Sequence, residues 1–216
     1  MNTKYRISVT RDVNFNLRIF IDGIKVAEKV DKTVIDSTPN SDSNILYLGR
    51  SGILYNDNTN KHFKGYIGNF YLNRSECKYT SDYTVEDYII GLDSKSLLTF
   101  TSEDVGFSTK VDSFESDIIW TNTGCTVVDN KLLFNGNTTR LLSSEYDTFI
   151  LNNNNWTIDL IFKCNQINTG TTLLDLRLNN NSFNGILITQ PAADPTSILI
   201  SVGDSTATQA YSYTLS

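Results

Sequence analysis

The sequence predicts an all-β chain folded as an antiparallel sandwich or jelly roll. Apolar and polar residues alternate with a period of two in most segments, as on strands with one face in a core. Segments rich in Asn, Asp and Gly separate these short strands about every 8–12 residues. No segment is long enough for a helical layer. The 216 residues suffice for one large domain or two small ones.

The clearest elements lie near the start of the chain. Residues 5–10 and 17–21 alternate between apolar and polar side chains, and residues 24–30 form a third run. Between the second and third runs stands Asp22-Gly23, the kind of pair that accepts the positive φ angles of a type I′ hairpin turn. Residues 4–30 therefore predict three antiparallel strands.

The remaining strands are predicted by shorter runs. In the first half we expect strands at 45–49, 63–72 and 97–100, with a short helix or turn within 78–90. In the second half the expected strands lie at 118–120, 126–128, 131–134, 140–142, 156–162, 172–177, 185–189, 197–202 and 210–215. Trp120 and Trp156 each stand beside apolar residues, so we expect them in the core.

Charge and composition exclude several function classes. The net charge of −6 lacks the basic face that nucleic acids or anionic membranes require, so neither partner is expected. No run approaches the ~20 apolar residues of a membrane span. The polar, alternating start from Met1 to Arg11 predicts no signal peptide. Three widely spaced cysteines predict reduced, partly buried thiols made in a cytoplasm.

The chain does not look like an enzyme. His62 is the only histidine, so any Ser-His or Cys-His site would need it, and no nucleophile motif accompanies it. The ExDxxE pattern of laminarinase-type glucanases fails at both candidate places, residues 115–120 and 145–150, because the last acid is missing. We therefore predict a non-enzymatic protein.

Several motifs in the first half resemble a known family. Residues 5–12 (YRISVTRD) and 17–23 (LRIFIDG) resemble the latter half of a laminin-G-like, concanavalin A-like jelly roll. Residues 45–50 (ILYLGR) and 63–72 (FKGYIGNFYL) are similar to the strands that follow in that family, with Asn69 where Asp is common. Residues 78–84 (KYTSDYT) resemble the tail found in phage tail or virion versions.

The second half of the chain resembles the front of the same domain. Residues 97–100 (LLTF), 111–113 (VDS), 133–136 (LFNG) and 156–163 (WTIDLIFK) look like its early strands. The back half of the jelly roll (1–95) thus precedes its front half (96–216).

Three arrangements would satisfy this reversed order. The chain is a circularly permuted single domain, or it swaps halves with neighbouring copies, or it is a piece of a tandem-repeat protein cut through two domains. The first two are favoured because separate half-domains would leave apolar sheet faces and strand edges uncovered. We expect the two halves to make one domain, within or between chains.

The resemblance implies a role as well as a fold. We expect a bacteriophage virion structural protein, on the tail, neck or capsid surface, made in the bacterial host cytoplasm. Its expected partners are other copies of itself, other virion proteins and a host-surface glycan. The alternative is a secreted or surface bacterial carbohydrate-binding module.

A glycan site needs an aromatic ring beside amides and carboxylates. Residues 55–62 offer this chemistry, so we expect carbohydrate binding by Tyr55, Asn56, Asp57, Asn58 and His62; the alternative is a solvated hairpin loop. No cofactor is expected, although the resemblance allows a calcium ion held by oxygens such as those of Asp57 and Asn58. The sequence shows no complete metal-ligand set.

Overall fold

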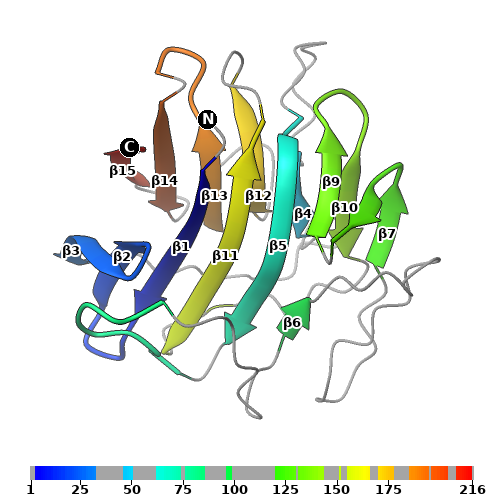
Figure 1. Cartoon of the computed structure of the whole chain (residues 1–216). Coiled ribbons are helices and arrows are strands. Elements are labelled where there is room, and N and C mark those ends of the chain that lie inside the picture. The colour runs from blue at the N-terminus through cyan, green and yellow to red at the C-terminus, as the bar shows by residue number, and fades with distance from the viewer. Residues whose placement is uncertain are drawn as a thin grey trace.

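The computed structural model describes residues 3–32, 46–50, 62–73, 76–85, 96–98, 120–129, 131–143, 151, 155–165, 170–177, 185–194, 196–203 and 208–215. Within these residues the chain forms two antiparallel sheets and no helix, which confirms the prediction of an all-β chain. Figure 1 shows the sheets as two layers, with β1, β11 and β5 in front.

The first sheet contains eight strands. In spatial order they are β3 (Ile24–Val30), β2 (Asn16–Ile21), β1 (Lys4–Arg11), β11 (Trp156–Cys164), β5 (Lys64–Asn73), β9 (Lys131–Asn135) and β8 (Thr126–Val128), with β6 (Ser96–Leu98) also paired to β5. The β2–β3 turn has φ of 49° at Asp22 and 82° at Gly23, as the predicted hairpin requires.

The second sheet contains seven strands. In spatial order they are β15 (Thr208–Thr214), β14 (Ser197–Gly203), β13 (Gly185–Gln190), β12 (Thr171–Arg177), β4 (Tyr47–Leu48), β10 (Arg140–Ser143) and β7 (Trp120–Thr123). Strand β4 is shorter than the predicted 45–49, and β6 covers 96–98 where 97–100 was predicted. Shifts of this size are ordinary at strand ends.

Both sheets contribute to one apolar core. The ring of Phe63 contacts those of Phe134 and Phe162, and all three are buried. The ring of Phe134, on the first sheet, lies so close to Gly49, which follows β4, that a Cβ on Gly49 would stand 2.1 Å from it. Trp156 is fully buried, as predicted, whereas the side chain of Trp120 lies outside the described residues.

In both sheets, strands from the early part of the chain lie beside strands from the late part. β1 pairs with β11 over eight residues, from Lys4 opposite Lys163 to Arg11 opposite Trp156. β5 pairs with the other side of β11, and β4 lies between β10 and β12. β1, β4 and β5 therefore obtain partner strands from residues beyond 130.

One correction concerns the outer face of the first sheet. The alternation in β1 predicts that Arg6, Ser8 and Thr10 face solvent, yet all three are buried. Residues 76–85 lie over this face as an extended segment, which we call the strap (Figure 1). A short helix or turn was predicted within 78–90; the described part, residues 78–85, contains no helix, and the rest lies outside the described residues.

Candidate functional site

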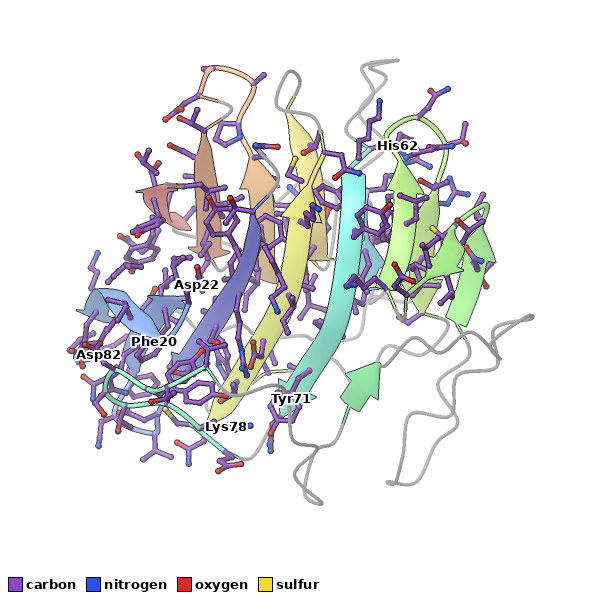
Figure 2. All side chains as sticks on the ribbon, in the orientation of Figure 1. Phe20, Asp22, His62, Tyr71, Lys78 and Asp82 are labelled. Atoms are coloured by element: carbon purple, nitrogen blue, oxygen red, sulfur yellow. The ribbon has the colours of Figure 1, made fainter. Side chains whose placement is uncertain are left out.

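Only one residue of the predicted carbohydrate site lies in the described part of the chain. Tyr55, Asn56, Asp57 and Asn58 fall outside it, so their part in a site stays a prediction. His62 is described and half-buried, and it forms an isolated bridge with Thr172 of β12. Figure 2 shows His62 at one end of β5, with Tyr71 and Lys78 at the other.

The geometry around His62 sets its hydrogen-bonding role. Its Nδ1 lies 3.2 Å from the backbone oxygen of Thr139, and a carbonyl can only accept. Nδ1 therefore carries the hydrogen, which leaves Nε2 of the neutral ring as an acceptor. Burial lowers the pKa of His62, and the charges of Arg50 and Arg140 lower it further, so the ring is neutral at pH 7.

Arg50 and Arg140 complete what we call the cationic corner: Arg50, His62 and Arg140. Arg50 follows β4 and Arg140 begins β10, and these two strands are hydrogen-bonded neighbours. Burial, then the charge of Arg140, lowers the pKa of Arg50. Neither arginine makes an ion pair with the residues that the structure describes, and the Nε of Arg140 is buried without a hydrogen-bond partner there.

This arrangement is suited to anions and hydroxyl groups. Two guanidinium groups present many N–H donors in fixed planes, and the imidazole adds one acceptor. Carboxylates and sulfates match guanidinium donors best. In the described residues no group of three or more His, Cys, Asp and Glu side chains could hold a metal ion.

The strap forms a second polar cluster, at the far end of the first sheet. Tyr79 and Tyr83 stack with ring centroids 3.8 Å apart and planes 11° from parallel. Beneath them, Nε of Arg6 donates to both carboxylate oxygens of Asp159, at 2.8 and 3.0 Å. The terminal nitrogen of Arg6 also donates to the Tyr79 hydroxyl at 3.0 Å.

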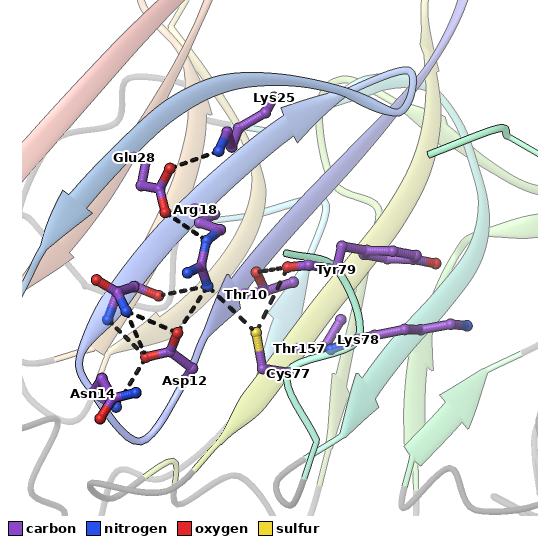
Figure 3. A network of polar contacts seen from close by, with 11 residues as sticks. Thr10, Asp12, Asn14, Arg18, Lys25, Glu28, Cys77, Lys78, Tyr79 and Thr157 are labelled. Atoms are coloured by element: carbon purple, nitrogen blue, oxygen red, sulfur yellow. Dashed lines mark hydrogen bonds and ion pairs between the residues drawn. The ribbon is translucent and has the colours of Figure 1, made fainter. Parts of the chain in front are cut away.

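Backbone and hydroxyl contacts fasten the strap along its length. Thr157 Oγ1 accepts from the Lys78 N–H at 2.9 Å, and Thr10 Oγ1 donates to the Tyr79 carbonyl at 2.9 Å. The Tyr83 N–H donates to the Gly23 carbonyl at 2.9 Å. Figure 3 shows the Thr10 contact beside Arg18, which bonds Asp12, Glu28 and Cys77. The stacked tyrosines thus bind the protein's own sheet.

The strap's phenols predict a loss of stability at alkaline pH. Burial, opposed by the Ser8 hydrogen bond but aided by the charge of Asp159, raises the pKa of Tyr83 to about 12. Burial, and then the same charge, raises the pKa of Tyr79 as well. The folded-state pKa lies above the unfolded value of about 10, so the folded protein favours the protonated phenols. Their contribution to the free energy of unfolding is complete below pH 10 and is lost as the pH rises through 12.

We expect the free energy of unfolding to fall between about pH 10 and pH 12. Urea titrations across that window, repeated on the double variant Tyr79→Phe/Tyr83→Phe, measure it. The variant should show a shallower fall, because its strap carries no phenol to ionise. Equal slopes in the two proteins would contradict the prediction.

Sequence reasoning named His62 but missed its two neighbours. Arg50 and Arg140 stand 90 positions apart and meet only because β4 inserts beside β10. One sequence feature could have pointed to them: each arginine is a basic residue at the end of a predicted strand in an acidic chain. The Arg6–Asp159 pair was missed for the same reason, since it joins β1 to β11.

Comparison with protein-family models, with curated proteins and with solved structures finds no match to this chain. Among the described residues no helix is long and apolar enough to cross a membrane. Cys125 and Cys164 are buried, and Cys77 is partly buried. The assignment of a function therefore depends on the sequence motifs and the geometry above.

Proposed function

We propose that this chain is a non-enzymatic structural protein of a bacteriophage virion that attaches to host-surface glycans carrying acidic groups. The observation that carries the attachment role is the cationic corner, where Arg50 and Arg140 flank His62 on a protein of net charge −6. The virion role is supported by the resemblance of residues 78–84 to the tail found in phage versions of the jelly roll.

The proposal includes a concanavalin A-like topology with the two halves in permuted order. It is supported by the way β11 lies between β1 and β5, because a half-domain made of residues 1–95 would lack this central strand. Strand β4 also belongs to the first half. Among the described residues it pairs only with β10 and β12, which belong to the second half. Such mixing is expected of one domain whose chain order has been rotated.

The charge of the corner narrows the ligand class. A neutral sugar would satisfy the N–H donors of Arg50 and Arg140 with hydroxyl oxygens and leave their charge without a counterion. A uronic acid or sulfated sugar would add charge-assisted hydrogen bonds, which are about twice as strong as neutral ones. The neutral His62 ring adds an acceptor for one sugar hydroxyl.

Glycan binding by the full chain tests the attachment role. We expect binding to immobilised uronic-acid and sulfated glycans and weaker binding to their uncharged counterparts. Arg50→Gln and Arg140→Gln should each weaken binding about ten-fold, the cost of a hydrogen bond to a charged group. Lys131→Gln, an exposed change of equal charge on β9, should leave binding unchanged.

Two results would overturn the attachment role. One is equal binding of charged and neutral glycans; the other is unchanged binding in both arginine variants. Turnover of a bound glycan would instead contradict the non-enzymatic assignment. A bacterial carbohydrate-binding module would bind equally well, so immunogold labelling of phage particles distinguishes it from a virion component.

A further inference from the structure

The edge strand β15 differs from the other outer strands in the described part of the chain. It pairs with all seven residues of β14 without a register shift, and it contains no charged residue and no proline. Its sequence, TQAYSYT, is rich in residues that favour strands. A long, regular, uncharged edge presents a row of backbone groups to another strand.

The other edges carry the features that normally prevent strand addition. β3 has a register shift opposite Ile19 and Phe20 and carries Lys25, Glu28 and Lys29. β7 and β8 have only four and three residues. Bulges, charges and short length all discourage pairing between chains. Within the described residues, β15 alone lacks all three.

The direction of its backbone groups follows from one hydrogen bond. The Leu215 N–H donates to the Thr196 carbonyl at 2.7 Å, so residue 215 faces β14. Successive residues of an antiparallel strand point their backbone groups to opposite sides. The residues whose N–H and C=O face the open edge are therefore Thr208, Ala210, Ser212 and Thr214, and their side chains are exposed.

We infer that β15 pairs antiparallel with β15 of a second copy of this chain, around a two-fold axis at Tyr211. In this register Thr208 lies opposite Thr214 and Ala210 opposite Ser212, so outward-facing backbone groups meet outward-facing groups in both copies. Gln209 and Tyr213, which point toward the core side, also lie opposite each other. No two charges face each other, and the same patch serves both partners, as a two-fold interface demands.

This inference rests on the proposed virion role, which implies that copies of the chain associate, and it names the surface through which they would do so. Native mass spectrometry and sedimentation of the full chain test it with two variants. Ala210→Pro removes an outward N–H and leaves the bonds to β14, whereas Ala210→Ser keeps the N–H and is the matched control. We expect a dimer for the wild type and Ala210→Ser, and a dissociation constant raised about ten-fold or more by Ala210→Pro.

Amide hydrogen exchange gives a second, variant-free test. On raising the concentration into the dimer range, the amides of Ala210 and Ser212 should slow, while those of Tyr211 and Tyr213 should not change. A monomer at every concentration, or an oligomer unaffected by Ala210→Pro with unchanged exchange at Ala210, would overturn the inference. Acidic-glycan binding by a monomer would reject this interface alone; a β15 dimer that binds no glycan would reject the attachment role alone.

Discussion

Replacing Asp159 with asparagine is expected to lower the free energy of unfolding by about 3–5 kcal/mol, the typical cost of removing one partner from a buried ion pair. The side chains of Arg6 and Asp159 are only 6% and 2% exposed. Burial opposes the charge of Arg6, but the hydrogen bonds and charge of Asp159 raise its pKa above the ordinary value. The variant leaves that guanidinium charged and without its carboxylate beneath the strap. Urea unfolding at pH 7 measures the loss.

Two further variants show whether burial of the Arg6–Asp159 pair causes the large loss expected for Asp159→Asn. Glu28→Gln removes an ion-pair partner of Arg18, and the Glu28 side chain is 40% exposed. This variant should lower the free energy of unfolding by no more than about 1 kcal/mol. The double variant Arg6→Met/Asp159→Leu removes both charges and should lose much less than Asp159→Asn. A loss for Asp159→Asn as small as that for Glu28→Gln would show that the pair is not desolvated.

The second large effect is expected at Trp156. This side chain is fully buried, and the guanidinium carbon of Arg11, also fully buried, lies 5.5 Å from its ring centroid. Trp156→Ala should cost about 3–5 kcal/mol for the cavity and about 2 kcal/mol more for the lost cation–π contact. The sum approaches the stability of an average domain, so the variant should be largely unfolded at 37 °C by circular dichroism.

Trp156→Phe is the matched comparison, because it keeps an aromatic face for Arg11. The indole N–H of Trp156 has no hydrogen-bond partner among the described residues, so phenylalanine leaves no partner group unsatisfied there. We expect this variant to remain folded and to lose less than half as much free energy as Trp156→Ala. Equal losses of unfolding free energy in the two variants would mean that an aromatic face beside Arg11 contributes nothing to stability.

Local patterns predicted the local parts of this fold. The β2–β3 hairpin was predictable because Asp22-Gly23 supplies the positive φ angles and the flanking alternation sets the face of each strand. The pairing of β1 with β11 was not predictable from alternation, which shows which face is buried but not which strand lies alongside. The resemblance, not the alternation, suggested that the two halves belong together.

The strap shows a second limit of local reasoning. The run Thr84-Val85-Glu86-Asp87 predicts a short helix or turn within residues 78–90. Their described part is instead held extended by Ser8, Thr10 and Thr157, which lie on distant strands. Only one residue of the cationic corner could be predicted from the sequence. His62 was a candidate because it is the only histidine, whereas Arg50 and Arg140 become neighbours only through strand pairing in the second sheet.

The pairing of early strands with late ones has a consequence for synthesis on the ribosome. β11 begins 58 positions after β6 ends, so β1 and β5 leave the ribosome well before the strand that joins them. At about 5–20 residues per second, their apolar faces wait several seconds for it. The first half therefore cannot complete its sheet until β11 has been synthesised, and the dominance of long-range pairings makes folding slow. The nascent first half is the stage at which chaperones would matter most.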